Sequence, residues 1–523
     1  MAGLNSFIFI YGPPASGKSS TGRALADRLH LTFVDLDTAI EQHAGRTIPE
    51  IFEADGEPHF RALESEILNT AMMDKPAVVA LGGGSLLDEA NLAACVESGV
   101  VVCLQVDETE LLARAENAKD ERPLVAGQVR EKMSRLLDAR RQHYASFSTR
   151  LNVNGLTVEE AAAQICILLG RFYIADPNRG GGYPGLVGEG LLADLPNLVN
   201  SCDIDGRIAL VSDSNVAPLY LDGVRNSLEG DGYSVAPFIF PAGETSKNLE
   251  TLQTLWDGFL GAGLGRKSMV LALGGGVVSD LAGYAAASFM RGIPWGALPT
   301  SLLGMVDASL GGKTGINLPA GKNLVGAFYP PRFVLADTAT LLTLPEREWH
   351  GGLAEVVKHG VIGDPGLFQL CDQGLDTLQG QAAALVSRAV AVKVDVVNRD
   401  PFEGGLRACL NYGHTIGHAV ETLSSYQLSH GEAVSIGMVA EAKLAEVLGL
   451  AEPGLTGEIS AVLAGFGLPV EIPPEMERSA MFEILHLDKK RAAGKVKFAL
   501  PVQIGKVEIG VVVNDLKNIL EEI

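Results

Sequence analysis

The chain has 523 residues, which is more than one hydrophobic core usually serves, so two to four domains are expected. Hydrophobic residues make up 47% of the chain and charged residues 20%, a globular balance that excludes long disordered stretches. The formal net charge of −22 argues against general binding to nucleic acid or to an anionic membrane.

The six cysteines are scattered without a CxxC pair, which is typical of reduced thiols in a cytosolic compartment. The apolar run near the N-terminus has no basic segment before it and leads straight into a phosphate-loop motif, so it predicts a buried strand and not a signal peptide. No run reaches the ~20 apolar residues of a membrane span. We therefore expect a soluble cytoplasmic protein with small-molecule substrates and no nucleic-acid or membrane partner.

The first third of the chain alternates short apolar runs with amphipathic stretches. Strands are predicted at 7–12, 32–37, 77–84 and 100–106, with helical patterns between them, as at 18–30. This alternation predicts a parallel sheet covered by helices on both faces.

A phosphate-loop motif lies between the first predicted strand and the first predicted helix. Residues 12–19 read GPPASGKS and fit G-x-x-x-x-G-K-[ST] in the context that the motif requires. Backbone N–H groups would cradle phosphates, Lys18 would reach the transferred group, and Ser19 could ligate Mg²⁺. The motif predicts a nucleotide site but says nothing about the acceptor.

Two further features lie where the next strands end, at the edge where parallel sheets bind ligands. Asp35 and Asp37 could divide metal-water binding and activation of a substrate hydroxyl. Glycines 82–84 would let a ligand approach the backbone. Taken alone, either feature also suits an ordinary turn or helix cap.

Together with FVDLDTAIEQHAGRTIPEIFEADGEPHFRALE, ALGGGSLL, ERPLV and the Arg140–Tyr144 spacing, these features make residues 5–172 resemble shikimate kinases. The resemblance implies a P-loop kinase domain over 1–172, in which Asp37 deprotonates the accepting hydroxyl and a lid carries Arg114 and Arg122. The implied ATP-binding residues are Gly12, Ala15, Ser16, Gly17, Lys18, Ser19, Ser20 and Arg122. The implied shikimate-binding residues are Asp37, Arg61, Gly83, Gly84 and Arg140, and those near Mg²⁺ are Ser19 and Asp35. Ala15 stands where the family usually has Gly and is reminiscent of gluconate kinases, which remain the alternative.

Proline, glycine and asparagine cluster at 175–190, where hydrophobic periodicity lapses, so a linker is expected at 173–182. Strands are predicted again at 207–213, 235–240 and 269–276. From about residue 346 helical patterns dominate. The predicted fold class is therefore α/β, with the kinase followed by a Rossmann-like α/β domain at 183–345 and then a mainly α-helical domain at 346–523.

Three stretches of this second part carry polar residues in unusual settings. A glycine run at 274–276 lies between a strand and a helix, followed by Asp280, and could receive a pyrophosphate. Segment 289–328 interleaves lysines, an arginine, an aspartate and an asparagine with glycine, and such groups are costly to bury without a ligand.

The third stretch has the pattern of a metal site. Glu355 and Lys358 share a face of a predicted helix, and Asn411, His414 and His418 read N-x-x-H-x-x-x-H, with His430 further along. Two histidines and a glutamate with an open position are typical of catalytic zinc. From the spacing alone, His414 and His418 would be the histidine ligands, and histidines used in helix packing are the alternative.

Residues ~183–523 resemble 3-dehydroquinate synthases, with YPGLVGEG, PAGETSKN, MRG, DASLGGKTGIN, GKN, AEVVKHG, LNYGHTIGHA, SHGEAV and DKK in order. The resemblance implies that Glu355, His414 and His430 hold the metal, and that His418 faces the substrate phosphate or transfers a proton. The implied NAD-binding residues are Asp213, Asn215, Glu244, Lys247, Gly275, Gly276, Asp280, Thr300, Ser301, Lys313 and Lys322. The implied substrate-binding residues are Arg291, Asp307, Lys313, Asn323, Lys358, Lys393, Arg407, Asn411, His418 and either Lys489 or Lys490. Among these, catalytic roles are implied for Asp307, Lys313, Lys358 and His418.

The two resemblances together imply a bifunctional enzyme of aromatic-compound biosynthesis. One half would phosphorylate shikimate with ATP and Mg²⁺. The other, with NAD and Zn²⁺ or Co²⁺, would convert 3-deoxy-D-arabino-heptulosonate 7-phosphate to 3-dehydroquinate and phosphate, as a homodimer through the synthase half. The alternatives are another sugar-phosphate cyclase, a metal-dependent polyol dehydrogenase, or a degenerate scaffold. The presence of Lys18, Asp37, Glu355 and His430 argues against a scaffold.

Overall fold

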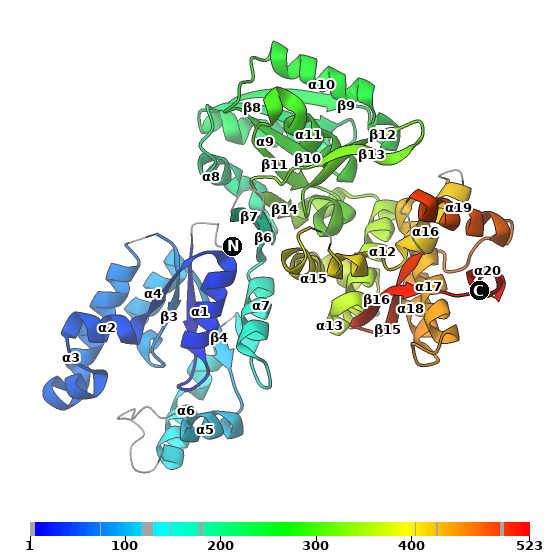
Figure 1. Cartoon of the computed structure of the whole chain (residues 1–523). Helices are drawn as coiled ribbons and strands as arrows, with labels where there is room; N and C mark the ends of the chain where they lie inside the picture. Colours follow the sequence, from blue (N-terminus) through cyan, green and yellow to red (C-terminus); the bar gives the residue numbers. More distant parts are fainter. Residues whose placement is uncertain are drawn as a thin grey trace. The chain divides into compact units, whose positions relative to one another are not determined.

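The computed structural model describes residues 6–73, 75–117, 129–147, 149–176, 181–402, 404–424, 427–491 and 496–522, without the side chains of 113–117, 129–132, 486–491 and 522. The chain divides into two compact units, Met1–Arg171 and Phe172–Ile523 (Figure 1). Each unit is described by itself. Among the described residues, no helix is long and apolar enough to cross a membrane.

The first unit is built on a parallel five-stranded sheet in the order β2-β3-β1-β4-β5. Its strands are β1 (Phe7–Tyr11), β2 (Thr32–Asp35), β3 (Ala77–Ala80), β4 (Gly99–Gln105) and β5 (Arg150–Asn152). Its helices are α1 (Lys18–Leu29), α2 (Leu36–Ala44), α3 (Ile48–Ala71), α4 (Glu89–Ser98), α5 (Glu108–Asn117), α6 (Val129–Ala145) and α7 (Val158–Leu168). The four strands predicted from the apolar runs are confirmed.

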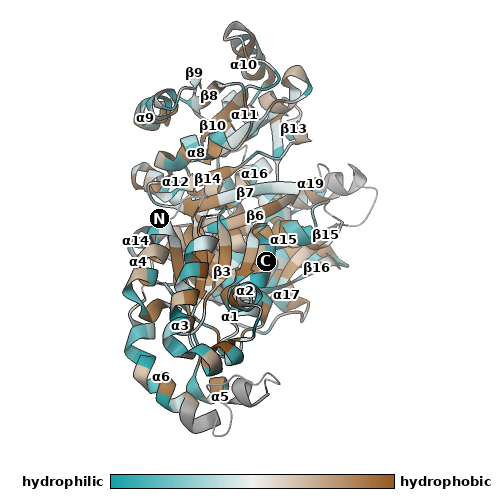
Figure 2. Ribbon diagram, turned by 90° about the vertical axis from the view of Figure 1, so that its left-hand side faces the viewer, coloured by the Kyte–Doolittle hydropathy of each residue, from teal (hydrophilic) through white to brown (hydrophobic). Residues whose placement is uncertain are grey.

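Alternate residues of β1 enter two different hydrophobic cores. Phe7 and Phe9 belong to one core, whereas Ile8 and Ile10 belong to the other, with Leu25 of α1. This follows from the two-residue repeat of a strand, which sends successive side chains to opposite faces. Figure 2 shows β3 as hydrophobic, whereas α2 and α3 mix hydrophilic and hydrophobic residues. The predicted parallel sheet with both faces covered is therefore present.

The second unit contains a seven-stranded sheet in the order β6-β7-β14-β11-β10-β8-β9. Its strands are β6 (Arg171–Asp176), β7 (Gly181–Gly188), β8 (Arg207–Asp213), β9 (Ser234–Phe240), β10 (Met269–Gly274), β11 (Trp295–Pro299) and β14 (Val334–Asp337). All neighbouring strands in the part of the sheet ordered β7-β14-β11-β10-β8-β9 pair in parallel. The helices of this part are α8 (Leu195–Asn200), α9 (Ala217–Gly230), α10 (Leu249–Gly261) and α11 (Gly276–Ser288). This architecture agrees with the Rossmann-like prediction.

The expected linker at 173–182 differs from the structure. Most of β6 and the start of β7 fall within it, and both strands belong to the sheet of the second unit. Four of the six residues of β6 are buried, including Phe172 and Ile174. Hydrophobic burial therefore makes this segment a strand, although glycines and prolines lie nearby. The units divide between Arg171 and Phe172.

The rest of the second unit is mainly helical, as predicted. The helices are α12 (Glu346–Gly363), α13 (Pro365–Cys371), α14 (Leu375–Gly380), α15 (Ala382–Arg399), α16 (His414–Leu423), α17 (His430–Val447), α18 (Leu455–Gly465), α19 (Arg478–Arg491) and α20 (Leu516–Glu522). Two antiparallel hairpins, which the sequence analysis missed, are β12 (Lys313–Leu318) with β13 (Gly321–Phe328), and β15 (Lys497–Gln503) with β16 (Lys506–Val512).

Helices α16 and α17 approach each other closely, and glycine makes this possible. A Cβ atom at Gly437 of α17 would lie 1.9 Å from the carbonyl oxygen of Gly413, and one at Gly417 would lie 2.9 Å from that of Ala433. Because those neighbours are backbone atoms, a side chain at either glycine would push the helices apart. The contact fixes the spacing between His414 and His430, the first residues of the two helices.

Candidate active sites

The phosphate loop of the first unit connects β1 to α1. Gly12 and Gly17 have positive φ angles of 137° and 88°, and a Cβ atom at Gly12 would lie 2.7 Å from the carbonyl oxygen of Leu104. Ala15 has a φ of 61°, a left-handed conformation that favours glycine. The Lys18 ammonium folds back over the loop and donates to the carbonyl oxygens of Gly12 and Pro13 at 3.1 and 2.9 Å.

Glycines 82–84 bring the predicted acceptor groups together beside this loop. A Cβ atom at Gly82 would lie 3.2 Å from Asp37 Oδ1, and one at Gly84 would lie 2.8 Å from Arg61 Nη2. At Gly83, the added atom would lie 3.2 Å from the loop residue Pro14. The backbone here therefore has no room for side chains, as a small acceptor site requires.

The carbonyl oxygen of Gly83 accepts hydrogen bonds from three side chains. Arg140 Nη1 lies at 3.0 Å, the Tyr144 hydroxyl at 2.7 Å and the Tyr11 hydroxyl at 3.3 Å. Arg140, Asp37 and Arg61 thus surround one glycine run. Asp35 instead caps α2, accepting from the backbone N–H of Thr38 at 3.2 Å.

Glu64, which was not among the predicted site residues, orients the side chain of Arg61. Glu64 Oε2 accepts from Arg61 Nη1 at 2.6 Å, and Oε1 accepts from the Ser85 hydroxyl at 2.5 Å. Glu64 is buried, so its charge requires such partners. The i, i+3 spacing within FRALE was the available signal. Arg122, predicted for the lid, and the Arg114 side chain lie outside the described residues.

In the second unit, the predicted nucleotide residues lie along one edge of the sheet. β8, β10 and β11 are neighbours and parallel, so Asp213 at the end of β8 lies at the same edge as Gly275 and Thr300, which follow β10 and β11. A Cβ atom at Gly275 would lie 3.1 Å from Ser301 Oγ. Because α11 begins at Gly276, its N-terminus also faces this edge.

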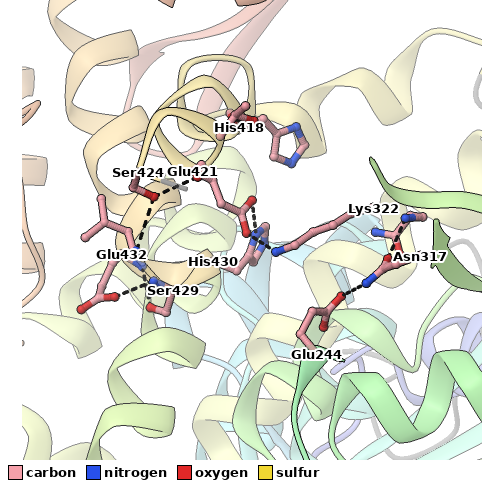
Figure 3. Close-up of polar contacts among 12 residues, drawn as sticks. Glu244, Asn317, Lys322, His418, Glu421, Ser424, Ser429, His430 and Glu432 are labelled. Atoms are coloured by element: carbon pink, nitrogen blue, oxygen red, sulfur yellow. Dashed lines mark hydrogen bonds and ion pairs between the residues drawn. The ribbon is translucent and has the colours of Figure 1, made fainter. Parts of the chain in front are cut away.

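The buried Lys247 contacts one residue predicted to bind the nucleotide and one predicted to bind the substrate. Lys247 forms an ion pair with Asp280 and donates to Asn323 Oδ1 at 2.5 Å. Burial raises the pKa of Asp280 even though Lys247 lies beside it. Glu244 accepts from Asn317 of β12 at 2.7 Å (Figure 3). The β12–β13 hairpin is therefore tied to the nucleotide edge.

Three helices bring together Glu355, His414 and His430, whose potential ligand atoms lie within 4.8 Å of one another. Glu355 Oε1 lies 3.4 Å from His414 Nε2 and 3.5 Å from His430 Nε2. Among the described residues, neither carboxylate oxygen of Glu355 accepts a hydrogen bond, although Lys358 forms an ion pair with it. A fully buried carboxylate facing two imidazole nitrogens fits a divalent metal.

The charges around this cluster are tightly coupled. Burial would raise the pKa of Glu355, but Lys358 and the two histidines lower it well below its usual range. Burial and Lys358 lower the pKa of His414 to about 3. Burial also disfavours charge on His430, but interactions with Glu355 and Glu421 raise its pKa to about 9. The pKa of each group in the cluster therefore depends on the charges of the others.

His418 occupies a different place from the one that spacing alone predicts. Its ring centroid lies 5.4 Å from that of His414, one turn earlier on α16, but Glu355 groups with His414 and His430. His418 is exposed and groups with Glu421 and His430. The i, i+4 spacing showed that two histidines share a face but not which one meets Glu355.

Other predicted substrate residues gather beside the cluster. Lys393 Nζ donates to Asp307 Oδ1 at 2.5 Å and to its carbonyl oxygen at 2.7 Å. Burial would raise the pKa of Asp307, but Lys393 lowers it below its usual range. A Cβ atom at Gly311 would lie 2.7 Å from Arg407 Nη2. Asp307 and Glu355 also group with His359, which is fully buried and which the sequence analysis missed.

The remaining predicted residues lie at the surface or outside the described part. Arg291, Lys313, Asn323 and Asn411 are exposed, and Arg291 has a positive φ of 69°. Lys313 Nζ lies 5.9 Å from the centre of the Phe328 ring. The side chains of Lys489 and Lys490 lie outside the described residues.

Comparisons with protein families match both units. The shikimate kinase model matches residues 14–169, and the N- and C-terminal models of 3-dehydroquinate synthase match 237–351 and 352–491. The 3-dehydroquinate synthase of Crocosphaera subtropica is 44% identical over 354 residues, covering 65% of this chain and 96% of the relative. That of Citrifermentans bemidjiense is 48% identical over 303 residues, covering 56% and 84%.

Solved structures of related enzymes share the fold of the second unit. A 2-deoxy-scyllo-inosose synthase complexed with carbaglucose-6-phosphate, NAD⁺ and Co²⁺ matches 67% of this chain and 99% of its own, with 28% identity and a TM-score of 0.61. A 2-epi-5-epi-valiolone synthase from Streptomyces hygroscopicus subsp. jinggangensis, with NAD⁺ and Zn²⁺ bound, matches 65% and 95%, with 32% identity and a TM-score of 0.60.

Proposed function

Because the chain belongs to the 3-dehydroquinate synthase family over its second unit and carries a shikimate kinase domain in its first, we propose that it catalyses both reactions. The first unit phosphorylates shikimate to shikimate 3-phosphate with ATP. The second converts 3-deoxy-D-arabino-heptulosonate 7-phosphate to 3-dehydroquinate and phosphate. The observation that carries the second assignment is the Glu355–His414–His430 cluster, in which the carboxylate is fully buried.

In the kinase, ATP phosphates lie on the loop 12–20, with Mg²⁺ near Ser19 and Asp35. Asp37 accepts the proton of the attacking hydroxyl, and Arg61 and Arg140 bind the acceptor carboxylate, because planar guanidinium groups pair well with carboxylates. The contacts of Asp37 and Arg61 with one glycine run support this arrangement. On binding, the acceptor carboxylate takes Arg140 from the Gly83 carbonyl.

In the synthase, the carboxyl edge of β8, β10 and β11 and the N-terminus of α11 would bind NAD. Glu355, His414 and His430 would hold Zn²⁺ or Co²⁺. When bound, NAD supplies a hydride acceptor that is regenerated, and the metal polarises a substrate oxygen.

The chain's own residues bind and orient the sugar phosphate. Lys358, Lys393 and Arg407 supply buried positive charge for its carboxylate and phosphate, and Asp307 holds Lys393 in place. His418 is exposed beside the metal cluster, where it can meet the phosphate or move a proton. Arg291, Lys313, Asn323 and Asn411 complete the substrate set.

The first experiment measures phosphate release from 3-deoxy-D-arabino-heptulosonate 7-phosphate by the purified chain with substoichiometric NAD, before and after chelation. We expect release that requires metal and yields 3-dehydroquinate. Acceptance of another sugar phosphate in its place would redirect the assignment to a cyclase like the inosose or valiolone synthases that share this fold.

The acceptor of the kinase is tested separately. Transfer of labelled phosphate from ATP is measured to shikimate and to gluconate under the same conditions. We expect transfer to shikimate, because two guanidinium groups and Asp37 surround the glycine run. Preference for gluconate would instead favour the relatives indicated by Ala15.

We also propose that the enzyme works in the cytoplasm as a homodimer through its synthase unit. The six cysteines are free, and five of them are buried, which suits a reducing compartment. Light scattering on the purified chain measures the oligomeric state, and a monomer would contradict this proposal.

A further inference from the structure

The two histidines of the metal cluster both direct Nε2 toward Glu355, but different groups face their Nδ1 atoms and support the rings. Each points Nε2 at Glu355 Oε1, at 3.4 Å for His414 and 3.5 Å for His430. Behind His414, Nδ1 lies 3.2 Å from the backbone carbonyl oxygen of Tyr412. Behind His430, Nδ1 faces Oε2 of Glu421 at 4.0 Å. One support is thus a neutral carbonyl, and the other is a carboxylate.

Glu421 is itself held from a third element. Its Oε1 accepts from Lys322 Nζ of β13 at 2.6 Å, and only 7% of its side chain is exposed (Figure 3). A buried carboxylate requires such a partner. Because Lys322 occupies Oε1, the other oxygen is left toward the imidazole of His430.

We propose that Glu421 is a positioning residue for His430, an inference that rests on the proposed metal site. A metal-bound Nε2 must be unprotonated, so the ring proton has to reside on Nδ1. Glu421 Oε2 lies 4.0 Å from Nδ1, an ion-pair distance, which would shorten to that of a hydrogen bond when the metal binds. That hydrogen bond would fix the tautomer and ring orientation and make Nε2 a stronger donor to the metal. Lys322 keeps the carboxylate in place and balances its charge, as Lys358 does for Glu355.

A competing role for Glu421 is direct ligation. Its carboxylate also groups with His418 and His430 within 4.8 Å, so a second cation could in principle bind there. That arrangement would place a cation on Oε2, beside the Lys322 ammonium on Oε1, and would share His430 between two metals. The existing ion pair therefore favours a supporting role over ligation.

The test compares Glu421→Gln with the matched control Glu432→Gln. Glu432 lies two residues after His430 but contacts the Ser429 cap and Arg347, and glutamine also serves in a capping box. Zinc dissociation constants are measured on the full chain by competition with a chromogenic chelator, together with the visible spectrum of the Co²⁺ form. Circular dichroism verifies folding, and Glu421→Asp replaces Glu421→Gln if that variant does not fold.

We expect Glu421→Gln to bind zinc about 10- to 100-fold more weakly, with a changed Co²⁺ spectrum, whereas the control stays within about twofold of the wild type. An unchanged zinc affinity in a folded Glu421→Gln protein would overturn the proposal. So would two zinc equivalents in the wild type of which this variant loses one, because Glu421 would then be a ligand. A wild-type chain that binds no zinc or cobalt would refute the proposed metal site itself, which is a separate result.

Discussion

The two units build their sites from different materials. In the kinase unit, the predicted ligand groups converge on backbone: a phosphate loop and the run Gly82–Gly84, against which Asp37, Arg61 and Arg140 lie. In the synthase unit, the centre of the site consists of charged side chains from separate helices, of which Glu355, Lys358 and Lys393 are buried. Loss of the half-buried Asp37 charge should therefore leave the kinase fold intact, whereas loss of a buried charge in the synthase site should lower its stability.

Metal removal should separate the two sites most strongly. After chelation and return of Mg²⁺ alone, we expect synthase activity to fall to background and kinase activity to be unchanged, because only the second unit holds the Glu355–His414–His430 cluster. Both activities are assayed on one sample, and added Zn²⁺ or Co²⁺ should restore the synthase. Parallel loss of both activities would contradict the separation of the sites.

Asp37→Asn should break the kinase site chemically and leave its fold intact. The amide cannot accept the hydroxyl proton, so kcat for phosphate transfer to shikimate should fall about 10²- to 10⁴-fold. Synthase activity in the same preparation serves as the internal control. A loss of less than about tenfold would remove Asp37 from the role of base.

The same contrast explains what the sequence could predict. The phosphate loop and the glycine run are each a short continuous segment of the sequence. Each follows a strand whose apolar residues are easy to recognise. The metal cluster is different, because Glu355 lies on α12 and the close packing of α16 on α17 brings in His430. Spacing therefore favoured His418, and only the family resemblance replaced it with His430.

The misplaced linker and the missed residues have related causes. Residues 173–182 contain enough glycine and proline to indicate a linker, but pairing with the sheet of the second unit makes much of the segment strand. Glu421 contacts Lys322, and Glu64 contacts Ser85 as well as Arg61, so each has a partner that lies far away in the sequence and that a local pattern does not indicate. The order of the strands likewise depends on packing between segments far apart in the sequence.

Lys393→Met should reveal the cost of a buried charge in the synthase unit. The substitution leaves the Asp307 carboxylate without its main partner, and we expect destabilisation by about 2–3 kcal/mol, since Asp307 is partly exposed. The matched control is Lys267→Met, whose ion pair with Asp203 is solvent-exposed and should contribute nothing measurable. Chemical denaturation followed by tryptophan fluorescence measures both, because all three tryptophans, at 256, 295 and 349, belong to this unit. Equal stability of the two variants would contradict the buried-charge argument.

Alanine at one glycine of each unit gives the finest test of the comparison. At Gly437 the new Cβ atom would meet the backbone oxygen of Gly413 at 1.9 Å, so α16 and α17 must move apart. We expect a destabilisation of about 1–3 kcal/mol and weaker zinc binding, because His414 and His430 begin these helices.

At Gly84 the new atom would meet Arg61 Nη2 at 2.8 Å, the end of a flexible side chain that can shift. Gly84→Ala should therefore raise KM for shikimate and lower the free energy of unfolding less than Gly437→Ala does. If both variants instead lowered stability equally, the kinase site would depend on tight packing as much as the synthase site does.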